Sequence, residues 1–184
     1  MSDLNEKCLE LFPEWLASLG SDLSVVVGAL KGPDLSQVSK RYLLGAVNYV
    51  FKSLDLIPDG IEDIGYLDDA FVLRLAAKGA LAGDEGTIDA STREKLSILS
   101  GECTIIEDFL GEEVYRRFEK YTDGLKNGAA RGRMVSEMLT HEDTFSELMD
   151  DAEKFIESFE APTFTGDEKN LIKLTAFFEA KLPK

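Results

Sequence analysis

The stretch VNYVFKSLDLIPDGIEDIGYLDDAFVLRL, from Val47 to Leu75, decides the fold of this chain. It begins at the end of one apolar run and finishes inside another, and it carries five aspartates in and beside the connection between the two runs. An apolar run without a polar face is typical of a helix that is buried on all sides. The stretch therefore predicts two buried helices that are joined by a short acidic turn.

The helix before the turn is expected to span residues 35–54 and to be the central helix of the molecule. Its middle, YLLGAVNYVF, has no charged residue between Tyr42 and Phe51. Pro58 places the connection after this helix, because the residue before a proline is disfavoured in helical space. Asn48 lies inside the apolar run and needs a hydrogen-bond partner if it is buried.

The helix after the turn is expected to run from Asp69 to about Ala82. Asp68 is well placed as its N-cap, because an aspartate side chain can accept a hydrogen bond from a free N–H of the first turn. The glycines at positions 60 and 65 punctuate the connection, as turn residues do. Residues 35–82 should thus form a helical hairpin.

The rest of the chain also shows helical spacing of apolar residues. In the segment 1–34, Pro13 either kinks one helix or separates two. In the segment 83–184, Ser/Thr-x-x-Glu signatures at Ser91, Thr104 and Thr165 predict helix starts, and the aromatic stripe 145–159 predicts a further amphipathic helix. No alternating run predicts a strand. The expected class is all-α: a bundle of about six to eight helices around the helix 35–54, with 83–184 packed on the same core.

The composition excludes several function classes. A net charge of -15 and a pI of about 4.5 argue against nucleic-acid binding, which requires clustered Lys and Arg. The N-terminal residues do not resemble a signal peptide, and no uncharged run reaches the roughly 20 residues that a membrane span requires. We expect a cytoplasmic protein that does not bind nucleic acid and for which membrane association is disfavoured.

The chemistry-bearing residues form no catalytic constellation. Cys8 and Cys103 are far apart in the sequence and are expected to be reduced and buried. His141 is the single histidine, so His-rich metal centres and dinuclear His/Asp sites are excluded, and it is expected to be exposed. The basic segment 130–133 is expected to be a solvated loop, and phosphate-binding glycine motifs are absent. These observations favour a protein that is not an enzyme.

The pattern D-L-I-P-D, a short spacer and then G-Y-L-D-D-A, after an apolar helix, resembles the YkvA-type family, the domain of unknown function numbered 1232. The resemblance covers roughly residues 35–82. It implies a small helical hairpin and, for some relatives, membrane association, and it implies no established reaction. Members usually have a second proline in the spacer, where this chain has Glu62.

The aspartates of the turn have two interpretations. Carboxylate oxygens are the ligands that hard cations prefer, so a Mg²⁺, Mn²⁺ or Ca²⁺ site is chemically reasonable. Alternatively, each side chain accepts hydrogen bonds from backbone amides of the turn and of the helix start, and this interpretation is favoured. The candidate ligands are Asp55, Asp59, Asp63, Asp68 and Asp69.

Three functions follow from these patterns. The leading hypothesis is a protein-interaction or scaffold module without a cofactor, which binds an unidentified protein partner or a second copy of itself, because amphipathic surface is abundant. The second is a divalent-cation-binding protein or metal-dependent enzyme that uses the acidic turn. The third, peripheral membrane association, comes only from the resemblance.

Overall fold

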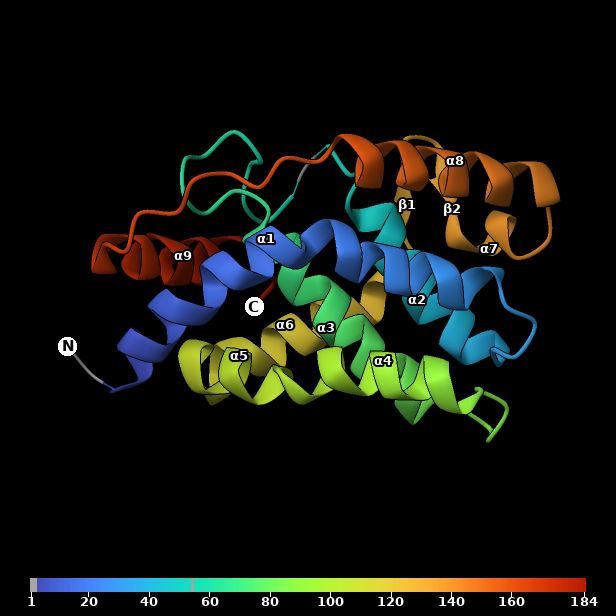
Figure 1. Ribbon diagram of the computed structural model, residues 1–184, viewed down its shortest axis with the longest axis horizontal. Coiled ribbons are helices and arrows are strands. Elements are labelled where there is room, and N and C mark those ends of the chain that lie inside the picture. The colour runs from blue at the N-terminus through green and yellow to red at the C-terminus, as the bar shows by residue number, and fades with distance from the viewer. Residues whose placement is uncertain (1–2, 54) are drawn as a thin grey trace.

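The computed structural model describes residues 3–53 and 55–184, and it is built almost wholly of helices, which confirms the all-α class. Figure 1 shows the arrangement of its elements. In chain order they are α1 (Asp3–Lys31), α2 (Gln37–Tyr49), α3 (Leu67–Ala82), α4 (Ala90–Gly101), α5 (Cys103–Leu110), α6 (Glu112–Leu125), β1 (Ala129–Ala130), β2 (Arg133–Met134), α7 (Val135–Met138), α8 (Glu142–Ser158) and α9 (Glu168–Lys181).

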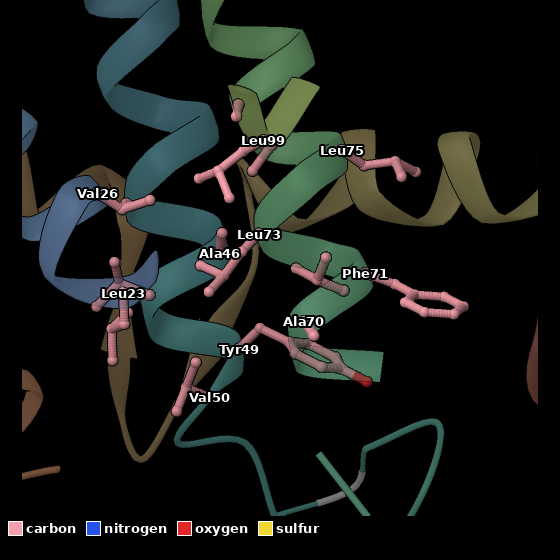
Figure 2. Packing of buried hydrophobic residues seen from close by; sticks show 14 of the residues in the cluster. Leu23, Val26, Ala46, Tyr49, Val50, Ala70, Phe71, Leu73, Leu75 and Leu99 are labelled. Carbon is pink, nitrogen blue, oxygen red and sulfur yellow. The ribbon is translucent and has the colours of Figure 1, made fainter. Parts of the chain in front are cut away.

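Helix α3 runs through the middle of the molecule, with α1, α2, α4, α5 and α6 packed against it (Figure 1). Every residue from Leu67 to Ala77 is buried, whereas in α2 the continuous buried run begins only at Leu43, with Ser39 as the one buried residue before it. Figure 2 shows side chains of α1, α2 and α4 meeting those of α3 in the core. The predicted hairpin of two buried helices is therefore present, and its second helix occupies the centre.

The predicted helix 35–54 is longer than the observed one. Helix α2 begins after Ser36, whose side chain accepts a hydrogen bond from the backbone N–H of Ser39, and it ends at Tyr49. Residues 50–53 form turns instead, and Leu54 lies outside the described residues. Helix α3 begins at Leu67, two residues earlier than expected.

Pro13 does not separate two helices. Helix α1 is continuous from Asp3 to Lys31 with Pro13 inside it. Phe12, Trp15, Leu16 and Leu19 of this helix are buried in the core. This packing against α3 offsets the loss of one backbone hydrogen bond at the proline.

Three helix starts differ from the sequence prediction. Asp89 rather than Ser91 caps α4, and Asp167 rather than Thr165 caps α9, each through its side chain. The helix predicted to start at Thr104 begins at Cys103 instead, and it ends at Leu110, before Gly111, which has a φ of 75° and separates α5 from α6. A left-handed residue cannot continue an α-helix, and glycine adopts that conformation without steric cost.

A short antiparallel ladder replaces part of the loop that was expected at 130–133. Ala130 pairs with Arg133 across the two-residue turn Arg131–Gly132, in which both residues have positive φ. This is the turn geometry that matches the twist of a hairpin. The Arg133 side chain is buried, and its Nη1 donates to Asp151 of α8 at 2.7 Å, so this arginine is not a solvated loop residue.

The aromatic stripe of α8 packs inside the molecule. Phe155 and Phe159 stack on each other with ring centroids 5.0 Å apart, and Tyr66 contacts both rings edge-on. Phe51 contacts Phe155 in the same manner. The stripe thus covers the turn between α2 and α3 rather than forming an open groove.

A buried ion network links α3 to α1 and to the junction between α4 and α5. Arg74 is 1% exposed, and its guanidinium donates to Glu102 at 2.7 Å and to Asp22 at 3.2 Å. The guanidinium also lies 4.1 Å from the ring of Trp15, whose indole N–H donates to Glu102. The charge in the centre of the bundle is therefore paired with two carboxylates.

Two predicted features of the chain can also be located. Cys8 and Cys103 are both buried, and neither forms a disulfide. His141 is exposed, just before α8. Within residues 3–53 and 55–184, no helix has the length and apolar character that a membrane crossing requires.

The close contact of α2 with α6 provides a stability test. A Cβ at Gly45 would lie 2.8 Å from the backbone of Leu125, so Gly45→Ala should lower the free energy of unfolding by about 1–3 kcal/mol. A Cβ at Gly28, in the exposed part of α1, would meet nothing within 4 Å, so Gly28→Ala should raise the free energy of unfolding by about 0.5–1 kcal/mol. Urea denaturation measures both, and equal effects would contradict the contact.

Candidate functional site

The acidic turn, defined here as residues 55–69, connects the end of α2 to the start of α3. Its backbone is fixed by hydrogen bonds from Ile61 N–H to Pro58 O and from Gly65 N–H to Ile61 O. A Cβ at Gly65 would lie 2.3 Å from the carbonyl oxygen of Asp59, so only glycine fits where the chain folds back on itself. The turn is thus a defined scaffold for its carboxylates.

Asp68 is not the N-cap of α3, because the helix has already begun at Leu67 and Tyr66 occupies the cap position with a φ of 69°. The Asp68 side chain is 0% exposed and accepts two hydrogen bonds at Oδ2. One comes from the hydroxyl of Tyr49 at 2.6 Å and one from Ile57 N–H at 3.0 Å. The aspartate therefore holds the turn against the last residue of α2.

Tyr49 connects the two sides of this arrangement. While its hydroxyl donates to Asp68, it accepts a hydrogen bond from Leu56 N–H at 2.8 Å. Figure 2 shows its ring beside Ala70, with the hydroxyl oxygen at the beginning of α3. Burial and the neighbouring charge of Asp68 raise the pKa of Tyr49, so this hydroxyl keeps its proton.

Asp69 differs from Asp68 in that its side chain accepts no hydrogen bond from the residues that the structure describes. It is 1% exposed, and neither of its carboxylate oxygens has a hydrogen-bond partner among the described residues. The same holds for Oδ1 of Asp68 and for Oδ1 of Asp55. A buried polar atom without a partner loses its hydration without compensation. These oxygens therefore require an explanation.

The carboxylates also raise one another's pKa values. Burial and then the charges of Asp68 and Asp59 raise the pKa of Asp55 to about 7. Burial raises the pKa of Asp68 to about 6, against the opposing hydrogen bond of Tyr49. Burial, followed by the charge of Asp68, raises the pKa of Asp69 well above its ordinary value. The site therefore binds protons at pH values where an exposed aspartate does not.

Asp55 and Asp59 lie at the accessible side of the turn. Both line a cleft of about 390 Å³ together with three basic residues, Lys52, Arg131 and Lys181. Asp59 is exposed as a whole residue, but the protein around its carboxyl group removes part of the hydration of that group and so raises its pKa. Solvent and ions therefore reach Asp55 and Asp59 from this cleft, whereas Asp68 and Asp69 are buried and do not line it.

Asp63 is separate from the other four aspartates. It adopts a φ of 70° and accepts hydrogen bonds from the backbone N–H and the hydroxyl of Thr165, at 2.7 and 2.8 Å. These hydrogen bonds lower its pKa. Asp63 anchors the segment before α9 to the turn, and we exclude it from the candidate site.

The four remaining carboxylates do not form a ready-made coordination shell. Among the residues that the structure describes, no group of three or more His, Cys, Asp or Glu side chains lies close enough together to hold a metal ion. Any cation here would be bound by one or two carboxylates, with water completing its shell, as is common for Mg²⁺.

Residues 39–75 match the family model described as a protein of unknown function, DUF1232. This DUF1232 segment contains α2 from Ser39 onward, the acidic turn and the first half of α3, and hence all five aspartates. The chain matches none of the curated proteins and none of the solved structures with which it was compared.

The sequence indicated the aspartates of the DUF1232 segment but not their partners. No local pattern connects Tyr49 with Asp68, and Thr165, which the sequence indicated only as a helix start, lies about a hundred residues beyond Asp63. Asn48 was expected to need a partner, and its Nδ2 donates to the carbonyl of Arg133 at 3.1 Å. These contacts depend on how helices far apart in the sequence pack.

Removal of the Tyr49 hydroxyl tests the joint between α2 and α3. Tyr49→Phe should lower the free energy of unfolding by about 1–3 kcal/mol, because it leaves Leu56 N–H without a partner and removes a donor from Asp68. Tyr42→Phe is the control, since its hydroxyl meets Asp123 at the surface and should contribute at most about 1 kcal/mol. Urea denaturation that gave equal losses would assign no special role to Tyr49.

Proposed function

We propose that this chain is a cytoplasmic, non-enzymatic helical protein whose acidic turn binds a divalent cation, Mg²⁺ or Mn²⁺. One observation carries the proposal: three of the four oxygens of the adjacent buried carboxylates Asp68 and Asp69 have no hydrogen-bond partner among the described residues. Carboxylate oxygens are the preferred ligands of these hard cations.

The balance of charge at the turn supports the proposal. In the described part of the chain, none of Asp55, Asp59, Asp68 and Asp69 forms a salt bridge. Lys52 lowers the pKa of Asp55, but burial and the charges of Asp68 and Asp59 outweigh this effect. Buried negative charge has to be neutralised by a proton or by a cation. A divalent ion would replace the protons that the raised pKa values retain.

The cleft beside Asp55 and Asp59 gives a cation access to the turn. Lys52, Arg131 and Lys181 line the same cleft and repel a cation, so we expect weak binding. A partly hydrated ion held by one or two carboxylates suits this arrangement better than a fully dehydrated one.

Protein interaction, which the sequence favoured, stays a prediction. The aromatic stripe of α8 packs against Phe51 and Tyr66, and its rings are half-buried. Among residues 3–53 and 55–184, four large apolar side chains are well exposed, and they come from different elements: Val38, Ile98, Met134 and Ile172. Peripheral membrane association likewise stays a prediction that comes from the resemblance alone.

A metal-dependent thermal melt tests the cation site. Metal-free protein is melted alone and with Mg²⁺, Mn²⁺ or Ca²⁺, beside Asp69→Asn. An ion at about 100 times its Kd stabilises the folded state by about 2.7 kcal/mol, which raises the Tm of a chain of this size by about 5–10 °C. We expect that rise in the wild type and its loss in Asp69→Asn.

Asp63→Asn is the matched control, because Asp63 belongs to the same turn but is bonded to Thr165. It should retain the metal-dependent rise. The proposal fails if no ion raises the Tm of the wild type, in which case protons alone neutralise Asp69. It also fails if Asp69→Asn keeps the full rise.

The metal-free protein should lose stability as the pH rises from about 5 to about 8. Asp55 and Asp68 have pKa values of about 7 and about 6, above the ordinary aspartate value, so their contribution to stability is complete below about pH 4 and is lost as the pH passes about 6 and 7. Urea denaturation across this range measures the slope, which Asp55→Asn should reduce because it removes the group with a pKa of about 7. A rise in stability over the range would contradict the assignment.

A further inference from the structure

A cavity of about 400 Å³ lies between α2, α6, the β1 strand and the segment that follows α9. Its volume is within the range of small-molecule sites in proteins. Tyr49 lines this cavity with its ring and contacts the acidic turn with its hydroxyl. Lys52 is also shared, since it lines both this cavity and the cleft beside Asp55 and Asp59, and the other lining residues have no part in the cation site proposed above.

The charge of the cavity is opposite to that of the protein. Three basic residues line it, Lys52, Arg117 and Lys120, and no aspartate or glutamate does. The whole chain has 35 acidic and 20 basic residues. A hollow with charges of one sign and walls of low dielectric constant concentrates ions of the opposite sign. The cavity therefore favours an anion.

Arg117 builds one wall of the cavity. Its Nε donates to the carbonyl of Pro183 at 3.0 Å, and its Nη2 donates to the carbonyl of Glu179 at 3.1 Å and also to that of Leu182. These are carbonyls at and beyond the end of α9, where cationic side chains are favourable. Arg117 therefore already donates hydrogen bonds to the backbone, and an anion would be bound by Lys52 and Lys120.

Lys52 is held in place by a hydrogen bond to Tyr121, which leaves other N–H donors of its ammonium group available. Its Nζ donates to the hydroxyl of Tyr121 at 2.8 Å and lies 5.1 Å from the centroid of that ring and 5.6 Å from that of Tyr49. An ammonium group has three donors. Within the described residues Lys52 forms no salt bridge, although its charge acts on Asp55. Lys120 is exposed and lies at the rim.

The other walls are apolar. The rings of Tyr49 and Tyr121 meet edge-on with centroids 6.2 Å apart, and Leu125 lies beside them in the lining. Gly124 contributes open space, because a Cβ built there would meet nothing within 4 Å. Asn48 is the one uncharged amide side chain in the lining, and its Oδ1 accepts no hydrogen bond in the described structure.

We infer that this cavity binds a small organic carboxylate with an apolar body. The carboxylate accepts hydrogen bonds from Lys52, with Lys120 supplying further positive charge at the rim. The body lies against the two tyrosine rings and the space left open by Gly124. An apolar wall with a few convergent polar groups is the usual composition of such a site.

Octanoate is the test ligand, and its binding is followed by displacement of 1-anilinonaphthalene-8-sulfonate fluorescence and by calorimetry. Octanoate should bind saturably, whereas octylammonium and inorganic phosphate should not. Lys52→Met keeps the length of the side chain and removes its charge, and it should weaken octanoate binding about tenfold or more. Gly124→Leu fills the cavity and should abolish binding.

Two control variants repeat the Lys→Met and Gly→Leu substitutions at positions outside the cavity. Lys154→Met removes an exposed lysine of α8, and Gly28→Leu places the same side chain on an exposed helical glycine of α1. Both should bind octanoate as the wild type does. Should Lys52→Met fail to fold, Lys120→Met replaces it, since Lys120 is exposed, and it should weaken binding in the same direction.

The inference is overturned if octylammonium binds as tightly as octanoate, because an apolar contact alone then explains the affinity. It is also overturned if Gly124→Leu binds normally or if no saturable binding occurs. Neither result bears on the cation site, whose test uses metal ions and Asp69→Asn.

Discussion

The fold depends on the burial of α3 around its whole circumference. A helix in that position removes its polar side chains from water, and each of them then has to find a partner inside the protein. Arg74 does so through Asp22 and Glu102, which ties α1 and the junction of α4 and α5 to the centre. A paired and hydrogen-bonded charge is the form in which a buried arginine is tolerated.

In the first turn of α3, the buried polar side chains are not fully compensated by partners from the protein. Asp68 has two donors, whereas Asp69 has none among the described residues, and neither is paired with a cationic side chain. The compensation that Arg74 receives from the protein is therefore missing here. A proton or a bound cation has to supply it, which makes this end of the helix sensitive to the solution while the middle is not.

Tyr49 lies where two features of the molecule meet. Its hydroxyl fixes the acidic turn, and its ring forms a wall of the basic cavity beside α6. Lys52, three residues later, likewise faces both the cavity and Asp55. The positive charge of Lys52 and the negative charge of Asp55 thus lie close together in the chain, just after the end of α2. The acidic turn and the cavity therefore have Tyr49 and Lys52 in common.

The sequence by itself determined the all-α class, the buried hairpin of the DUF1232 segment and the position of the aspartates, because these depend on local periodicity, proline and charge. Only the tertiary structure decided what the aspartates do. Asp68 resembles a helix cap, yet it accepts hydrogen bonds from Tyr49 and Ile57, and Asp63 is drawn to Thr165. The cavity is likewise formed by segments far apart in the chain. Such contacts arise from the packing of helices on α3, and no local pattern in the sequence records them.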